Sequence, residues 1–146
     1  MQASGTIPQI YFNNGGDKDK ILTVEQWGNN PWTSMANAFH GATNLRIPAT
    51  DAPDLSGVTN MSFLFHAATV FNDPINHWDV SNVTNMARLF AGADAFNQPL
   101  NNWDVSRVTT FLATFKAASF NQPIGNWIMS STTDMYLMFD GASSFN

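Results

Sequence analysis

The feature that most constrains this chain is an internal repeat of about 25 residues. The segment from Trp78 to Met86 reads Trp-Asp-Val-Ser-Asn-Val-Thr-Asn-Met, and it returns from Trp103 to Phe111 as Trp-Asp-Val-Ser-Arg-Val-Thr-Thr-Phe. Looser copies begin at residues 27, 53 and 127, so successive units begin 26, 25, 25 and 24 residues apart. A unit this short cannot bury its apolar face alone, and stacking the units buries each face against its neighbours.

Aromatic residues recur at fixed places in these units. One column comprises Phe39, Phe65, Phe90, Phe115 and Phe139, and a second is the Phe of the Phe-Asn pairs at 71–72, 96–97, 120–121 and 145–146. Because like positions lie one above another in a stack, we expect the rings to form columns with the strand spacing of about 4.8 Å. Each ring would bury on the order of 150–250 Å².

Local patterns within one unit predict a strand followed by a helix. Residues 78–81 alternate apolar and polar side chains, which is the period of a strand. A helical stripe at i, i+3, i+7 and i+10 follows, comprising Val83, Met86, Phe90 and Ala93. Ser81 or Thr84 is the expected N-cap, and Gly92 favours an early end to the helix.

These patterns predict an α/β solenoid of about five strand–helix units with short parallel strands. Residues 1–26 lie outside the period, and two apolar runs flank Asn13 to Gly16, so we predict an N-terminal capping β-hairpin there. The predicted units of the repeat array, residues 27–146, are 27–52, 53–77, 78–102, 103–126 and the incomplete 127–146. No cap follows the last unit, which predicts either end-to-end self-association through it or further repeats beyond it.

Composition excludes several classes of function. The six basic residues are scattered and the net charge is −5, which disfavours nucleic-acid binding. The chain has no cysteine, and no apolar run approaches the roughly 18 residues of a membrane span, so we expect no thiolate site and no membrane insertion in this segment. No nucleophile elbow, zinc-protease helix, phosphate loop or dinucleotide fingerprint is present, so we expect neither catalysis nor a cofactor.

The motif resembles a known family. Trp-Asp-Val-Ser-x-Val-Thr-x-Met followed by Phe-Asn-Gln-Pro-Leu is similar to the BspA-like repeats of bacterial surface proteins, which are also classified as a mycoplasma lipoprotein repeat of unknown function; the similarity covers roughly residues 22–146. The resemblance implies a leucine-rich-repeat-like solenoid, located outside the cell or at its surface, with adhesion as a function of some members. It supplies no catalytic residues. Pro53 and Ile128 depart from the motif, so its Trp and Asp are not required in every unit.

The expected function is therefore a non-enzymatic surface binding or adhesion module that presents a repeated polar face to a protein or glycan. The alternative is a structural spacer or self-associating filament segment. The expected binding residues, here called the polar strip, are Asn76, His77, Asp79, Ser81, Asn101, Asn102, Asp104, Ser106, Arg107 and Asn126. Their identities vary between units while the core positions persist, as expected for a fixed scaffold with a variable surface.

Three further columns have two interpretations each. Asp54, Asp79 and Asp104 stack, so each needs either a cation or a donor such as a nearby backbone N–H. Asn72, Asn97, Asn121 and Asn146 either satisfy loop backbone or contact a ligand. His40 and His66 share one position in adjacent units, where they are either solvated helix residues or part of a metal site. A metal site would need further ligands, and the next units offer Ala91 and Lys116.

Overall fold

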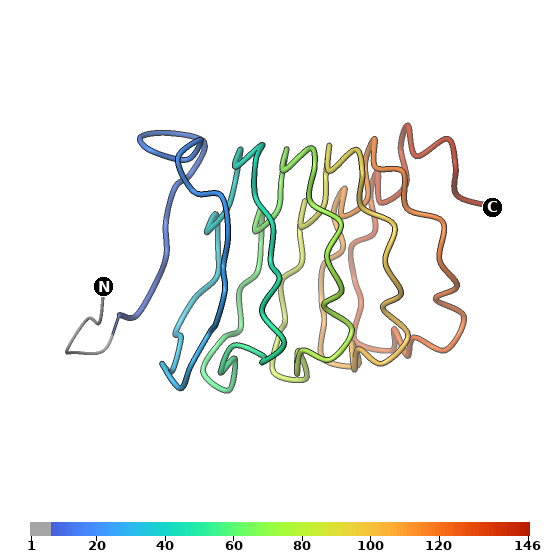
Figure 1. Cartoon of the computed structure of the whole chain (residues 1–146). Helices are drawn as coiled ribbons and strands as arrows, with labels where there is room; N and C mark the ends of the chain where they lie inside the picture. Colours follow the sequence, from blue (N-terminus) through green and yellow to red (C-terminus); the bar gives the residue numbers. More distant parts are fainter. Residues whose placement is uncertain (1–6) are drawn as a thin grey trace.

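The protein is a stack of chain coils, and from residue 27 onward each coil corresponds to one sequence repeat (Figure 1). The structure is a computed structural model, which describes residues 7–146. Within that range there is no helix and no strand longer than a single bridge. Five isolated parallel bridges join neighbouring coils: Thr23–Arg46, Pro31–Asp54, Asn60–Asn85, Asn85–Thr110 and Thr110–Asp134. The predicted leucine-rich-repeat-like α/β solenoid of strand–helix units is therefore wrong.

Consecutive turns replace the predicted helix in every unit. These turn segments are residues 35–42, 61–68, 86–93, 111–118 and 135–142. In the third, the N–H groups of Leu89, Ala91 and Ala93 donate to carbonyls three residues back, at 3.2, 3.3 and 3.0 Å. Arg88 and Gly92 have positive φ values of 56° and 64°, a left-handed conformation that no right-handed helix contains.

The remaining N–H groups of each turn segment bond to the next coil. In the third segment, Met86, Arg88, Phe90 and Gly92 donate to carbonyls of the following coil at 2.8–3.1 Å. The same four bonds recur at every junction from the coil of Met35 to the coil of Asp140, always at 2.8–3.1 Å. An α-helix would use these N–H groups within itself, so bonding between coils takes the place of helical bonding.

Layer thickness explains why the turns are preferred. The first phenylalanine column exists as predicted, with centroids 5.9, 5.7, 5.6 and 5.5 Å apart along Phe39, Phe65, Phe90, Phe115 and Phe139. Packed helices lie about 8–10 Å apart, whereas hydrogen-bonded extended chains lie about 4.8 Å apart. The rings can stack at these distances only if the backbones of neighbouring coils are about as close together as paired strands.

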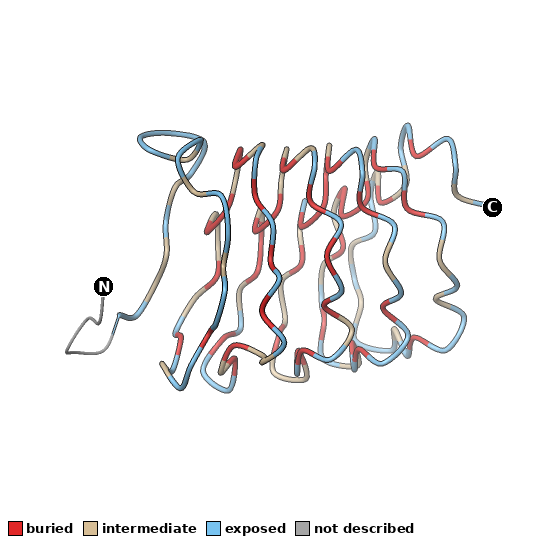
Figure 2. Cartoon of the chain, viewed as in Figure 1, coloured by how far each residue is buried: buried red, intermediate tan, exposed pale blue. Residues whose placement is uncertain are grey.

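The second phenylalanine column stacks against the first. Phe71, Phe96, Phe120 and Phe145 follow one another at 5.6, 6.2 and 6.2 Å. Within each coil the two rings lie 3.9–4.1 Å apart. The predicted helical stripe is buried although no helix exists, since Val83, Met86, Phe90 and Ala93 all point into this core. Figure 2 shows buried stretches recurring at similar places along successive coils.

The predicted caps have other roles. Thr84 is not a helix N-cap: its hydroxyl donates to the carbonyl of Thr59 in the previous coil at 3.2 Å. Thr109 bonds to Thr84 in the same way at 3.0 Å, so threonines form a ladder between coils.

The N-terminal β-hairpin is also wrong. The two apolar runs pair with the first repeat rather than with each other: Thr33 N–H donates to the Pro8 carbonyl at 3.0 Å, and Val24 N–H donates to the Arg46 carbonyl at 3.0 Å. Residues 7–26 therefore form an additional coil at one end of the stack (Figure 1). The predicted turn from Asn13 to Gly16 is confirmed, with Gly15 N–H bonded to Phe12 at 2.9 Å. Residues 1–6 of the predicted cap lie outside the described residues.

Candidate functional site

The polar strip lies on equivalent segments of three neighbouring coils, residues 76–81, 101–107 and 126. Seven of its members are exposed: His77, Asp79, Asn101, Asn102, Asp104, Arg107 and Asn126. Asn76, Ser81 and Ser106 are partly buried. Between them the apolar side chains of Trp78, Trp103 and Val105 point inward and are buried. The alternation predicted for this segment therefore sends the polar side chains to the surface, even though no regular strand forms.

Asparagines join the coils within the strip. Asn76 Nδ2 donates to Asn101 Oδ1 at 3.1 Å, and Asn102 N–H donates to Asn76 Oδ1 at 2.9 Å. Asn126 Nδ2 donates to the Asn101 carbonyl at 2.6 Å. These contacts hold the side chains in one arrangement, so a partner would not have to order them on binding.

The aspartates of the strip accept from backbone in a tight turn. Ser81 N–H donates to Asp79 Oδ1 and Ser106 N–H donates to Asp104 Oδ1, both at 3.0 Å. Asp54 makes the same bond to Ser56. Hydrogen bonds from Ser106 lower the pKa of Asp104, so its carboxylate is charged at neutral pH. The turn interpretation of this column is thus confirmed, and among the described residues no three potential metal ligands come together.

The basic member of the strip is also anchored. Arg107 Nη1 donates to Asn82 Oδ1 of the previous coil at 2.9 Å. His77 Nε2 lies 3.3 Å from the Asp51 carbonyl. The strip therefore exposes carboxylates, amides and one guanidinium in fixed positions, a surface suited to hydrogen bonding and charge recognition.

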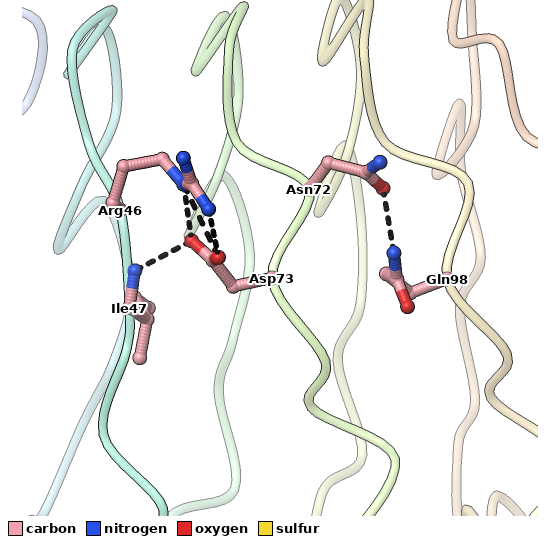
Figure 3. A network of polar contacts seen from close by, with 5 residues as sticks. All are labelled: Arg46, Ile47, Asn72, Asp73 and Gln98. Carbon is pink, nitrogen blue, oxygen red and sulfur yellow. Dashed lines mark hydrogen bonds and ion pairs between the residues drawn. The ribbon is translucent and has the colours of Figure 1, made fainter.

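The asparagine column satisfies loop backbone, as one of its two interpretations predicted. Asn97, Asn121 and Asn146 each donate a backbone N–H to the side-chain oxygen of the asparagine one coil earlier, at 2.9, 2.8 and 3.2 Å. Gln98 Nε2 adds a bond to Asn72 Oδ1 at 3.3 Å (Figure 3). These amides serve the scaffold.

One polar cluster was not predicted from the sequence. Arg46 binds both carboxylate oxygens of Asp73 at 2.7–3.1 Å, and Ile47 N–H donates to the same carboxylate at 2.6 Å (Figure 3). Burial raises the pKa of Asp73, but the bonds from Arg46 and Ile47 outweigh it and lower the pKa overall. The sequence feature that could have indicated this cluster is the aspartate at position 73, because the equivalent residues of later units are the uncharged Gln98 and Gln122.

The two histidines face each other. The rings of His40 and His66 lie 4.6 Å apart at a steep angle, and neither buried Nδ1 atom has a hydrogen-bond partner among the described residues. Burial, then His40, then Arg88 lower the pKa of His66 to about 4, so the ring is neutral at physiological pH. Among the described residues no third potential ligand joins the pair, whereas zinc sites in proteins use three or four protein ligands.

Comparison with known proteins gives one family. The family model described as "Mycoplasma protein of unknown function, DUF285" matches residues 33–146. No curated protein and no solved structure matches the chain. The family description names no activity or partner, so the expected adhesion has no support from it. None of the described residues forms a helix long and apolar enough to cross a membrane.

Proposed function

This chain belongs to the DUF285 family, and we propose that it is a non-enzymatic binding module whose polar strip recognises another protein. The observation that carries the proposal is the fixed display of charged and amide groups on successive coils. Inter-coil bonds hold Asn76, Asn101 and Asn126 in place, and turn bonds hold Asp79 and Asp104. A pre-ordered surface loses little conformational entropy on binding, which favours affinity.

A protein partner is favoured over a glycan. Sugar-binding surfaces commonly include an exposed aromatic ring, because such rings present apolar area beside polar groups. The aromatic residues adjoining the strip, Trp78 and Trp103, are each 3% exposed and belong to the core. The strip instead offers carboxylates, which suit basic groups of a protein.

Beyond membership of the DUF285 family, we propose that the chain is related to the BspA-like surface repeats. This relationship is supported by the motif at Trp78 to Met86 and its recurrence. With it we propose a location outside the cell or at the cell surface. The proposal retains no leucine-rich-repeat-like geometry and does not require adhesion.

The test is a binding screen of the intact chain against immobilised matrix proteins and glycans. For any partner found, Asp79→Lys with Asp104→Lys should weaken binding at least tenfold. Asp79→Asn with Asp104→Asn retains the turn acceptor and removes only the charge, so it should weaken binding without altering the melting curve. Asp94→Lys changes an exposed aspartate outside the strip and is the matched control. Unchanged affinity in both double variants excludes the strip, and selective glycan binding refutes the protein partner.

A structural spacer is the second candidate function. The continuous core and the recurring inter-coil bonds favour it, because each coil is tied to its neighbours throughout the described chain. A spacer should keep its length in solution, which small-angle X-ray scattering measures; a compact or flexible particle would exclude it.

A further inference from the structure

A cluster of aromatic and basic side chains lies on the turn segments, apart from the segments that carry the polar strip. It comprises His40, Phe63, His66 and Arg88, which come from three neighbouring coils, and we call it the donor patch. The Phe63 ring centroid lies 5.7 Å from that of His40 and 5.4 Å from that of His66. The Arg88 guanidinium lies over the same ring, with Cζ 5.5 Å from its centroid. Each of the three coils has a described coil on both sides, so the donor patch belongs to the side of the stack.

Phe63 differs from every other phenylalanine of the chain. The others belong to the core cluster or pack against it, whereas Phe63 does neither and is only partly buried. The equivalent residues of the other units are Asn37, Arg88, Ala113 and Leu137, so the repeat does not require an aromatic ring here. The core therefore does not account for the Phe63 ring, which instead contacts the polar side chains of the donor patch.

Arg88 is the one basic residue whose side chain has no polar partner in the described part of the chain. Four of the six basic side chains form ion pairs with aspartates, and Arg107 donates to Asn82. Arg88 is exposed, and its recorded contact is with the ring of Phe63. Its five N–H donors are therefore free to bind an anion.

The two histidine rings present hydrogen-bond donors to solvent. The Nδ1 atoms of His40 and His66 are buried without a partner among residues 7–146, whereas their Nε2 atoms are not buried in this way. Orphaned buried N–H groups are rare in native proteins, so we place the proton of each neutral ring on Nε2. Both rings then direct an N–H group outward, and the ring centroids lie only 4.6 Å apart.

The charges around these rings disfavour a cation and attract an anion. Burial and then the charge of Lys18 lower the pKa of His40, and Arg88 contributes to the lowered pKa of His66 after burial and His40. No carboxylate contributes to either shift. A metal ion would meet the same positive potential, whereas an anion would be stabilised by it.

One fixed charge and two neutral donors match singly charged carboxylates. A guanidinium binds a carboxylate through two parallel N–H bonds, and imidazole N–H groups can donate to a carboxylate as well. A phosphate dianion would bring a second negative charge for which the donor patch has no free cation. The patch extends over three coils, roughly 10 Å at the spacing of paired strands. One carboxylate cannot reach across it, but a segment with several acidic side chains can.

We propose that the donor patch binds an acidic peptide segment of a partner protein, with carboxylates held by Arg88 and by the Nε2–H groups of His40 and His66. The methylene groups of the acidic side chains would pack against Phe63. The polar strip exposes carboxylates and suits a basic partner, so the two surfaces take ligands of opposite charge. The inference goes beyond the proposed function of the polar strip and does not depend on it.

The test follows the histidine ring resonances of the full chain by nuclear magnetic resonance while a peptide is added. The probe is a short peptide of alternating glutamate and glycine, and its control has glutamine in place of glutamate. The glutamate peptide should shift the resonances of His40 and His66, whereas His77, which lies in the polar strip, should not respond. The glutamine peptide should shift none of the three. Acetate should shift the same two histidines only at concentrations about tenfold higher or more, because it offers a single carboxylate.

Substitutions identify the groups that bind the peptide. Arg88→Gln removes the free charge at an exposed position and should weaken peptide binding about tenfold, because hydrogen bonds to charged groups are strong. His66→Phe keeps an aromatic ring, removes one donor and should weaken binding less. Arg107→Gln removes the same charge from the polar strip and should leave the affinity nearly unchanged. Both arginine variants should melt like the unaltered chain, since neither side chain belongs to the core.

Several results would overturn the proposal. They are a glutamate peptide that shifts neither histidine, a glutamine peptide that shifts both equally well, and inorganic phosphate that binds more tightly than the glutamate peptide. Acetate that binds as tightly as the peptide would exclude an acidic segment as the ligand. A loss of affinity in Arg107→Gln as large as in Arg88→Gln would place the peptide elsewhere. None of these results bears on the polar strip, because its test uses Asp79 and Asp104 and other partners.

Discussion

Replacing Phe90 by alanine should destabilise the protein more than the same change at the end of the column. Phe90 is fully buried and contacts four aromatic rings, with Phe65, Phe96 and Phe115 centred 5.7, 4.0 and 5.6 Å away and Trp103 at 6.2 Å. Buried Phe→Ala changes cost about 3–5 kcal/mol. With aromatic neighbours on every side, we expect about 4–5 kcal/mol for Phe90→Ala.

Phe139 provides the comparison within the same column. It is only partly buried and stacks on two rings, Phe115 and Phe145, at 5.5 and 3.9 Å. We expect about 2 kcal/mol for Phe139→Ala, because a half-buried ring has less contact area to lose. Phe90→Leu keeps most of the volume and should cost about 1.5 kcal/mol.

Urea unfolding followed by circular dichroism measures these differences, and thermal unfolding checks them. For a chain of this size about 1 kcal/mol corresponds to about 2–4 °C, so Phe90→Ala should lower the Tm by about 8–20 °C. Equal losses at the two positions, or a loss below about 1.5 kcal/mol at Phe90, would refute the claim that stacked rings stabilise adjacent coils.

Five other substitutions, grouped in three tests, address separate features of the structure. Folding lowers the pKa of His66 to about 4, so the unfolded chain binds the proton more tightly and stability should fall as the pH drops from 6.5 to 4. The ring is partly exposed and solvent screens it, so we expect a loss of about 1–2 kcal/mol, less than the full shift would give. In His66→Ala, pH-dependent unfolding should lack this component, and an unchanged profile would contradict it. Asp73→Ala should lower the free energy of unfolding in urea by about 2 kcal/mol, because it removes a buried acceptor. Asp140→Ala breaks an exposed ion pair and should lower it by less than about 1 kcal/mol. Equal losses would argue against a stabilising role for the bonds from Arg46 and Ile47 to Asp73. Gly92→Ala should destabilise the protein by about 0.5–1 kcal/mol and Ala117→Gly should stabilise it by a similar amount, because both positions have positive φ. A higher Tm for Gly92→Ala and a lower Tm for Ala117→Gly would exclude this backbone conformation.

The repeat and its phenylalanine columns could be predicted from the sequence, because a residue that returns every 25 positions must meet its own copies in a stack. The ring stacking from Phe39 to Phe139 confirms this. The turns could not be read from the same stripe. Val83, Met86, Phe90 and Ala93 fit one face of a helix, but consecutive turns bury the same positions. Layer thickness distinguishes the two, since a helix is about twice as thick as the spacing that the rings require.

The candidate site was predictable in its exposure and less so in its contacts. Because Asp79 and Ser81 alternate with the apolar Trp78 and Val80, the sequence predicted that they face solvent. In the structure Asp79 is exposed and Ser81 is partly buried. The bond between Arg46 and Asp73 joins residues that are not at equivalent repeat positions, so no repeat pattern marks them as partners.

Through-bond nuclear magnetic resonance couplings across hydrogen bonds test the central claim most directly. The claim is that alternate N–H groups of each turn segment bond to the following coil instead of within a helix. We predict a coupling between the Phe90 nitrogen and the carbonyl carbon of Thr114, whose oxygen lies 2.9 Å from that nitrogen. A coupling to the carbonyl of Met86, four residues back as in an α-helix, would contradict it.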